Sequence, residues 1–354
     1  MGLLEQTLAE ITPQDTEWRG RATSRLEQLT MPHWALGRLM DLAVDLAGIT
    51  RSLDPPIARR AVVVMAADHG VALEGVSKYP QEVTPQMVRN FAAGGAGINA
   101  LAEPAGAKVV VVDMGVAGDL EDLVKAGKII SKRIAAGTRS LAQGPAMTRE
   151  QAIRSVEAGI EMARGLASGI DVFGTGEMGI ANTTSSSAII AVLCQAPVEE
   201  VTGQGTGIDE EQRRHKIAVI KKALAINRPD PASGLDVLAK VGGFEIGGIA
   251  GLILGAAALK KPVIVDGFIS TAAALIANAL APNSREYMIA AHRSAERGHH
   301  VALEHLKKAP LLDLDLRLGE GTGAALAMHM VEGAVRILTR VATFEEASVS
   351  KADK

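Results

Sequence analysis

The chain has 354 residues, of which 47% are hydrophobic and 22% charged, and its formal net charge is −3. This composition is typical of a globular protein, and the lack of a basic excess argues against nucleic-acid binding. Aromatic residues make up only 3% of the chain, which also argues against a platform for stacking single-stranded bases.

Three further features bear on where the protein works. Cys194 is the single cysteine, so no disulfide can form within the chain, and a reducing, cytoplasmic location is expected. The N-terminal segment carries early acidic residues and lacks the apolar core of a signal peptide. The longest apolar stretch, residues 247–259, is too short and too rich in glycine to span a bilayer, so we expect no membrane association.

The predicted elements change in kind near residue 60. Residues 1–60 are predicted to be helical, because apolar side chains such as Leu4, Leu8 and Leu39 recur at helical spacing. Short apolar runs that end in glycine or acidic residues follow, with helical stretches between them. These runs predict strands at residues 61–67, 109–112, 169–173, 263–265 and 312–318. The continuous runs indicate a parallel sheet buried on both faces, whereas 312–318 alternates, as in a strand with one wetter face.

A long helix is predicted over residues 322–342, and it is expected to pack with the N-terminal helices as a small second domain. The predicted division is residues 1–60 with 322–354 as a small helical domain and residues 61–321 as a large α/β catalytic domain. Nearly every glycine-rich cluster follows a predicted strand. Because ligands bind outside the carboxyl ends of parallel strands, this placement is the first indication of a site.

The segment from Gly174 to Ser185 follows a strand and opens a helix, and it contains the pattern G-x-G-x-x-G at 174–179. A dinucleotide site, as in a NAD-dependent oxidoreductase, is one interpretation. Glu177 would then lie where a pyrophosphate binds, and no strand ends in an acidic residue about 20 positions later. A monophosphate held at the helix N-terminus fits better, with Asn182 capping the helix and Glu177 accepting from ribose hydroxyls. The alternative is a plain strand–helix turn.

Two more glycine-rich segments are candidate ligand contacts. Residues 202–207 hold three glycines in six positions, which allows close backbone approach, and Lys216 in the next helix can add a charge to a phosphate. A flexible loop with a solvated lysine remains the alternative. In 318–323, Glu320 stands between glycines beside a cleft. Burial against a planar ligand would raise its pKa toward that of a general base, and the alternative is an acidic residue favoured by the helix dipole.

Histidines give a weaker signal. His69 follows a predicted strand and is expected to order its own loop more often than to act as a base. His299, His300 and His305 lack the spacing of a metal site and are expected on a solvated helix, so no metal is predicted. Cys194 follows an apolar run and is expected in the core.

Together these segments resemble the nicotinate-nucleotide–dimethylbenzimidazole phosphoribosyltransferase family of cobalamin biosynthesis. The resemblance covers residues 61–340, and its segments occur in the same order as in the family. It rests on seven segments, namely 67–71, 174–184, 202–207, 241–248, 265–268, 292–296 and 318–323. It implies a Rossmann-like parallel sheet flanked by helices, with a small helical domain built from both termini. It also implies transfer of phosphoribose from nicotinate mononucleotide to an aromatic base, without a cofactor or a metal.

The resemblance also assigns residues. Glu320 matches the catalytic glutamate. The nucleotide and phosphate contacts match Gly174, Gly176, Glu177, Gly179, Ile180, Asn182, Thr202, Gly203, Gly205 and Lys216. The acceptor-base pocket matches Tyr79, Met87, Met178 and Leu318. The family further implies a homodimer, and a heterodimer with a paralogous subunit stays open.

The acceptor pocket departs from the family pattern. Relatives that use benzimidazoles tend to carry a small polar residue, a glutamine and a leucine where this chain has Tyr79, Met87 and Met178. Methionine adapts its shape but does not replace a glutamine amide that serves an azole nitrogen. We therefore expect an acceptor range that includes phenol or a methylphenol as well as benzimidazoles. The runner-up functions are the oxidoreductase and a nucleotide-binding regulator without catalysis.

Overall fold

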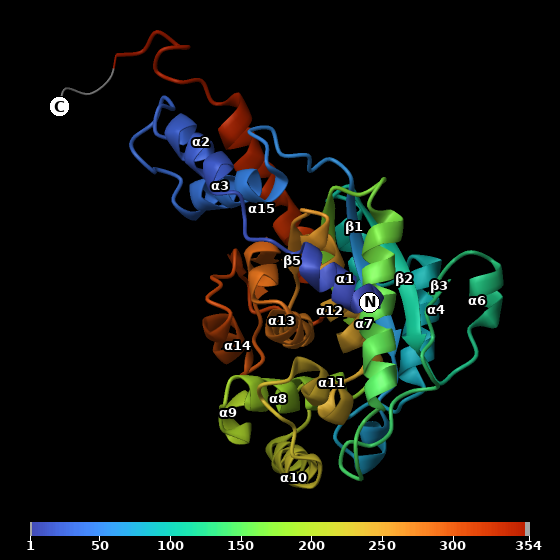
Figure 1. Cartoon of the computed structure of the whole chain (residues 1–354). Helices are drawn as coiled ribbons and strands as arrows, with labels where there is room; N and C mark the ends of the chain where they lie inside the picture. Colours follow the sequence, from blue (N-terminus) through green and yellow to red (C-terminus); the bar gives the residue numbers. More distant parts are fainter. Residues whose placement is uncertain (1, 351–354) are drawn as a thin grey trace.

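A computed structural model describes residues 2–350 (Figure 1). Its main sheet has six strands in the order β3-β2-β1-β4-β5-β6, and all of its strand pairs are parallel. The strands are β1 (Arg60–Ala67), β2 (Ala107–Gly115), β3 (Ile130–Ser131), β4 (Val172–Met178), β5 (Val263–Val265) and β6 (Met288–Ala290). A second, two-stranded sheet pairs β7 (His292–Arg293) with β8 (Leu312–Asp313). The α/β fold class predicted from the sequence is confirmed.

Helices connect the strands and cover both faces of the sheet. The helices are α1 (Leu3–Glu10), α2 (Thr16–Leu26), α3 (Arg38–Thr50), α4 (Val83–Ala93), α5 (Gly97–Ala102), α6 (Glu121–Lys125), α7 (Arg149–Leu166), α8 (Asn182–Leu193), α9 (Val198–Val201), α10 (Glu210–Asn227), α11 (Gly234–Val241), α12 (Phe244–Ala258), α13 (Phe268–Leu280), α14 (His299–His305) and α15 (Thr322–Arg340). Two 3₁₀ turns, η1 (Gly70–Glu74) and η2 (Pro282–Tyr287), complete the elements.

The central strand β1 explains why the sheet is covered on both sides. All eight of its residues are buried. Alternate side chains enter two different hydrophobic clusters, Val63 and Met65 on one face and Val62 and Val64 on the other. Because successive side chains of a strand point to opposite faces, a continuous apolar run is what a doubly covered strand requires. Each buried valine contributes about 1.5–3 kcal/mol.

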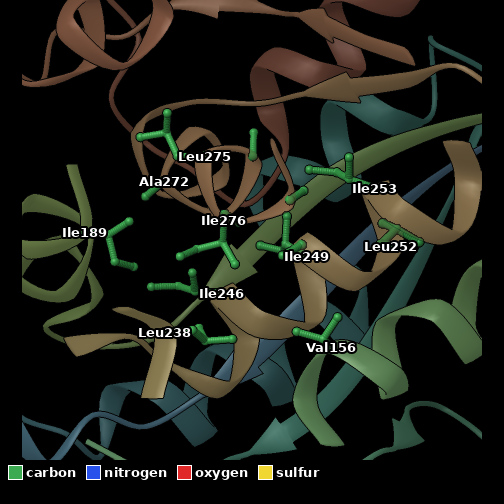
Figure 2. Packing of buried hydrophobic residues seen from close by; sticks show 14 of the residues in the cluster. Val156, Ile189, Leu238, Ile246, Ile249, Leu252, Ile253, Ala272, Leu275 and Ile276 are labelled. Carbon is green, nitrogen blue, oxygen red and sulfur yellow. The ribbon is translucent and has the colours of Figure 1, made fainter. Parts of the chain in front are cut away.

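The first cluster lies between the sheet and helices α7, α8, α11, α12 and α13, whose apolar side chains meet in Figure 2. Helix α12 packs on α7 at very short range. A Cβ added to Gly159 of α7 would lie 2.7 Å from the backbone nitrogen of Leu252 in α12. The glycine lets the two backbones touch, so the glycine-rich sequence of α12 is a packing surface.

Helices α2, α3 and the C-terminal half of α15 pack together at one end of the molecule (Figure 1). Helix α1 does not join them, although the predicted small domain included it. Leu4 is buried in the first cluster, and α1 packs on α7 and α12. The division at residues 60 and 321 stays a prediction, because the cluster that holds α3 and α15 is continuous with one face of the sheet.

Three strand predictions were wrong in extent, and one of them is β2, which runs beyond the predicted 109–112 at both ends. Only Leu312–Asp313 of the run 312–318 is a strand, since Asp315 takes a left-handed backbone with φ 54° and breaks the extended run. Strand β4 extends beyond the predicted end at residue 173, because residues 174–178 pair with β1 as far as Ala66. Glycine was taken as a turn signal there, yet in this strand it serves close packing.

Candidate active site

A cavity of about 490 Å³ opens at the carboxyl edge of the sheet. The ends of β4 and β5 lead into it, and helices α8, α13 and α15 begin beside it. Of the predicted site residues, the cavity wall includes Tyr79, Met87, Glu177, Met178, Gly179, Ile180, Asn182, Gly205, Leu318 and Glu320. The structure therefore brings the predicted catalytic, nucleotide and acceptor residues to one cavity. Gly174, Gly176, Thr202, Gly203 and Lys216 lie outside its wall.

Glu320 projects from a tight turn directly before helix α15. It takes φ 61°, between Gly319 at φ 82° and Gly321 at φ 94°. A left-handed backbone is uncommon for a residue with a side chain, and such positions occur often at functional sites. The Glu320 carboxylate is buried and accepts a 3.0 Å hydrogen bond from the Ile98 backbone N–H. Burial raises the pKa of Glu320, and this backbone donor opposes the rise.

Gly174 and Gly176 form the surface of β4 beneath this turn. A Cβ on Gly176 would lie 2.9 Å from the carbonyl carbon of Glu320. A Cβ on Gly174 would lie 3.2 Å from the Ala324 side chain of α15. These two glycines are therefore part of strand β4 rather than of a phosphate loop, and their lack of side chains lets the Glu320 turn rest on the sheet.

Glu177 lies in the same cavity wall as Glu320, and the Glu320 backbone hydrogen-bonds to its carboxyl group. It accepts a 2.5 Å hydrogen bond from the Asn182 side chain. Burial raises the pKa of Glu177 to about 8, against the effect of the Asn182 bond, and the nearby charges of Asp266 and Glu245 add to the rise. Burial in this site therefore favours the protonated form of Glu177. A protonated carboxyl can donate as well as accept a hydrogen bond to a sugar hydroxyl.

The predicted cap of helix α8 was wrong in detail. The N-cap is Ala181, which has φ 73° and no side-chain capping bond. Asn182 is the first helical residue, and its amide reaches Glu177 instead of the backbone. Within this turn the N–H groups of Asn182 and Thr184 donate to the carbonyls of Gly179 and Ala181 at 3.1 and 2.9 Å. The positive end of the helix dipole still lies beside the cavity, where it favours an anion.

Lys216 lies behind the cavity wall. Its ammonium group donates a 2.7 Å hydrogen bond to the Thr183 hydroxyl, and the side chain is only 1% exposed. A Cβ on Gly205 would lie 3.1 Å from the Lys216 nitrogen. Burial lowers the pKa of Lys216 to about 8, while the Glu296 carboxylate opposes the fall. A solvated lysine, the alternative considered above, does not describe this residue.

Thr202 and Gly203 sit one layer away from the cavity. The Thr202 hydroxyl donates to the Val198 carbonyl at 2.7 Å, and its carbonyl accepts from Arg213 at 2.8 Å. A Cβ on Gly203 would lie 3.0 Å from the carboxyl carbon of Glu296. Glu296 also accepts a 2.9 Å bond from the Gly205 N–H. Both predicted residues therefore shape the loop, and Gly205 is its member at the cavity.

The acceptor end of the cavity is apolar. Met87 and Met178 are half-buried there, while Tyr79 is 53% and Leu318 60% exposed at the rim. None of these four side chains carries a charge at neutral pH, and Glu320 follows Leu318 by two residues in the same wall. A planar aromatic compound can lie on such side chains with one edge turned toward Glu320.

Several wall residues were absent from the predicted set. They are Val83, Thr183, Thr206, Gly267, Phe268, Ile269, Ser270, His292, Ser294, Glu296, Arg317 and Gly319. Segments 265–268 and 292–296 contribute to the resemblance, yet neither supplied a predicted site residue. The signal that would have found them is the end of strand β5, because the same edge rule applies to every strand of the sheet.

Two of the histidines considered in the sequence, His69 and His299, are buried and make structural hydrogen bonds. His69 is fully buried, with Nε2 2.6 Å from the Glu245 carboxylate and Nδ1 3.1 Å from the Ser185 hydroxyl, so it joins β1 to α8 and α12 rather than ordering its own loop. His299 is also buried, not solvated as predicted, because its ring bonds to the Ser294 N–H and the Thr271 hydroxyl. Burial lowers the pKa of His299 to about 3.

Residues 2–350 contain no group of three or more metal-ligating side chains placed to hold an ion. Over the same residues, no helix combines the length and hydropathy that a membrane span needs. Cys194 is partly buried against the first hydrophobic cluster, and burial raises the pKa of its thiol to about 12.

Comparisons with known proteins agree with this geometry. The sequence profile of a family described as Phosphoribosyltransferase matches residues 11–349. Nicotinate-nucleotide–dimethylbenzimidazole phosphoribosyltransferases of Syntrophotalea carbinolica and Chloroflexus aggregans are 67% and 54% identical to this chain, and each match covers 99% of both chains. The crystal structure of such an enzyme from Thermus thermophilus matches with a TM-score of 0.90 at 47% identity, covering 96% of this chain and 100% of that one.

These relatives give no support to the oxidoreductase alternative, and the glycines of its motif at 174 and 176 lie within a strand. The match extends over nearly the full length of both chains, so it includes the cavity and all the elements that shape it. The chain belongs to the nicotinate-nucleotide–dimethylbenzimidazole phosphoribosyltransferase family.

Proposed function

We propose that this protein transfers the 5-phosphoribosyl group of nicotinate mononucleotide to an aromatic base, the lower ligand of a cobamide. The products are nicotinate and an α-riboside 5′-phosphate. The single observation that carries the proposal is Glu320, a buried carboxylate with a left-handed backbone, in the wall of one cavity that also holds Asn182 and Met87. Family membership and the full-length relatives support the same reaction.

The chemistry fits one carboxylate base. The nicotinate ring is a cationic pyridinium while it is bonded to the anomeric carbon, and it becomes a neutral pyridine when that bond breaks. Its departure therefore needs no acid. The acceptor must lose a proton as its nitrogen or oxygen attacks. Glu320 takes that proton, and its raised pKa suits the task better than that of an ordinary carboxylate. Attack opposite the leaving group converts the β-nucleotide into the α-riboside.

The polar end of the cavity suits the nucleotide. We assign the phosphate to the N-terminal end of α8 beside the Gly205 loop, with the buried Lys216 behind them as a counter-charge. Glu177 and Asn182 are then placed for the ribose hydroxyls. Gly179 and Ile180 complete the wall between phosphate and acceptor. Positioning both substrates in one cavity supplies most of the rate enhancement that such a simple reaction needs.

For the acceptor, we propose a range that includes phenol or a methylphenol as well as benzimidazoles. The support is the apolar end of the cavity, where Met87 and Met178 offer no amide to an azole nitrogen. The Tyr79 hydroxyl at the rim can donate to or accept from a phenol oxygen. Specificity against close analogues comes mainly from polar groups that are left unpaired, and these side chains leave few.

The assembly and location remain proposals. We infer a homodimer, or a heterodimer with a paralogous subunit, in which the second chain covers the rim formed by the exposed Tyr79 and Leu318. Sedimentation of the purified protein, alone and with paralogues from the same source, distinguishes the two assemblies. The cytoplasm is the expected compartment, since a chain with a single cysteine suits a reducing environment.

Mass spectrometry of the products tests the proposed function. The purified protein is incubated with nicotinate mononucleotide and a panel of benzimidazoles, purines and phenols. The proposal expects free nicotinate and an α-riboside 5′-phosphate with at least one base. A protein that binds the mononucleotide but releases no nicotinate with any base would be a binding protein instead. Tight binding of NAD in a parallel titration, without binding of the mononucleotide, would instead support an oxidoreductase function.

A further inference from the structure

Asp266 lies immediately beyond strand β5 and has no place in the reaction described so far. Its side chain is 1% exposed. One carboxylate oxygen accepts a 3.1 Å hydrogen bond from the Gly321 N–H, and the other accepts a 3.0 Å bond from the Ala324 N–H. Its own N–H donates to the Thr175 hydroxyl at 3.0 Å. Asp266 therefore joins the ends of β5 and β4 to the residue that follows Glu320.

The backbone conformation of the Glu320 turn needs hydrogen bonds that hold it in place. Residues 319, 320 and 321 all have positive φ, and only two of the three are glycines. Holding a glutamate in this conformation has a conformational cost that the surrounding structure must offset. Ile98 contacts the Glu320 carboxylate, and the Thr322 hydroxyl donates to the Gly319 carbonyl within the turn. Asp266 bonds to the backbone of the turn and also ties it to strands β4 and β5.

From this geometry we propose that Asp266 is a positioning residue for the general base Glu320. It fixes the strained turn so that the Glu320 carboxylate points into the cavity, and it places a second negative charge behind that carboxylate. The proposal rests on the proposed function, because it takes Glu320 as the base. In this proposal, the residue that follows strand β5 determines both the pKa of Glu320 and the direction of its side chain.

Each carboxylate oxygen of Asp266 accepts a hydrogen bond from a backbone N–H, and such bonds favour the charged form. Burial raises the pKa of Asp266, and these donors together with the His292 ring, 3.7 Å away, oppose the rise. The charge of Asp266 in turn raises the pKa of Glu320. The cavity wall around Glu320 also holds titratable groups from other elements, while α5 presents backbone N–H groups. These groups are Glu177 from β4, His292 from β7, Arg317 from the preceding segment, Glu296 and Tyr79.

The test is the pH profile of kcat for Asp266→Asn in the full-length protein. The asparagine removes the negative charge. Its NH₂ group replaces one of the two oxygens that accept from the Gly321 and Ala324 N–H groups, so one of these N–H groups loses its acceptor. We expect kcat to fall roughly 10- to 100-fold, as misplacement of a catalytic group by about 1 Å can cause. Glu320 must be ionised to act, so a lower pKa moves the acidic limb of the profile to lower pH. KM for the mononucleotide should stay near the wild-type value.

Asp113→Asn is the matched control. Asp113 is also a buried carboxylate at a strand end, where it accepts from the N–H groups of Gly115 and Val116 at 2.9 and 2.8 Å. It lies outside the cavity wall. A loss of stability without a change in the pH profile is expected of this variant. A profile that moves equally in both variants would overturn the proposal, because the effect would then be structural.

If Asp266→Asn does not fold, Thr175→Val loosens Asp266 while keeping its charge. In that variant kcat should fall and the position of the acidic limb should stay unchanged. Failure of this inference is distinct from failure of the proposed function. Suppose that Glu320→Gln is inactive while the Asp266 and Thr175 variants keep the wild-type kcat and pH profile. Glu320 would then remain the base, and Asp266 would have no positioning role. A fully active Glu320→Gln would remove both.

Discussion

The carbonyl of Glu320 rests on the Cα of Gly176, so that a Cβ at position 176 would lie 2.9 Å from the Glu320 carbonyl carbon. One residue is the candidate base and the other belongs to the glycine motif that first suggested a nucleotide loop. Their contact shows that Gly176 supports the backbone of the Glu320 turn, while Gly179 of the same motif lies in the cavity wall.

This contact predicts the effect of Gly176→Ala. The added methyl group must displace backbone, so we expect a loss of roughly 1–3 kcal/mol in the free energy of unfolding and a lower kcat. Gly333→Ala in the middle of α15 is the control, because a Cβ there meets nothing within 4 Å. That variant should gain about 0.5–1 kcal/mol and keep its activity. Urea unfolding and steady-state rates check both, and a stable, fully active Gly176→Ala would show that the turn has room to move.

Glu177 predicts a dependence of stability on pH. Its pKa is raised from 4.5 to about 8 in the folded protein, so folding favours the protonated form. The stability that this group contributes is present below its unfolded pKa and is lost as the pH rises toward 8. Glu177→Gln does not titrate, so its stability relative to wild type should improve between pH 5 and pH 8, by more than about 1 kcal/mol.

Urea unfolding at the two pH values measures this difference. The exposed Glu150 on α7 provides a control, and Glu150→Gln should differ from wild type by the same small amount at both pH values. An equal difference at pH 5 and pH 8 for Glu177→Gln would mean that its carboxylate is not held in the protonated form.

Lys216 predicts how the phosphate is held. Lys216→Met removes the charge behind Thr183 and Gly205, and the affinity for nicotinate mononucleotide should fall roughly 10- to 100-fold, the usual value of a bond to a charged group. Nicotinic acid riboside, which has no phosphate, should bind both proteins equally. Lys221→Met, at an exposed position on the same helix, should change neither affinity. Calorimetry with the two ligands decides, and an equal loss for the riboside would place the effect of Lys216 elsewhere.

The acceptor end predicts a change in base preference. Met87→Gln combined with Tyr79→Ser should depress the use of phenol more than that of benzimidazole, because the amide can serve an azole nitrogen and the tyrosine hydroxyl is lost. A competition assay with both acceptors at equal concentration gives the ratio of products. If the wild type makes no phenolic riboside, alone or with any paralogous subunit, the benzimidazoles alone stand as acceptors.

The parts of the fold that sequence predicts well are those set by local patterns. The run of β-branched residues in β1 could only be a doubly buried strand, and the periodicity of α15 located that helix within two residues of its end. The extent of β4 was missed because Gly174 and Gly176 make room for the Glu320 turn and helix α15, which lie about 140 positions later in the chain. No local pattern carries that contact.

The same limit applies to the site. Glu320 and Glu177 were found because each stands alone among glycines, a pattern that exposes a side chain to a cleft. Asp266 and Glu296 bond to backbone N–H groups of distant loops, at Gly321 and at Gly205. Their partners become visible only when the strands are assembled, so their roles could not be assigned from spacing.

Product formation by Glu320→Gln tests the central claim most directly. The variant keeps the size of the side chain and removes its ability to accept a proton. With nicotinate mononucleotide and benzimidazole, mass spectrometry should show α-riboside 5′-phosphate from the wild type, and turnover in the variant should be lower by roughly 10²-fold or more. Calorimetry should show unchanged affinity for the mononucleotide. Near-normal turnover of Glu320→Gln would contradict the assignment of Glu320 as the base.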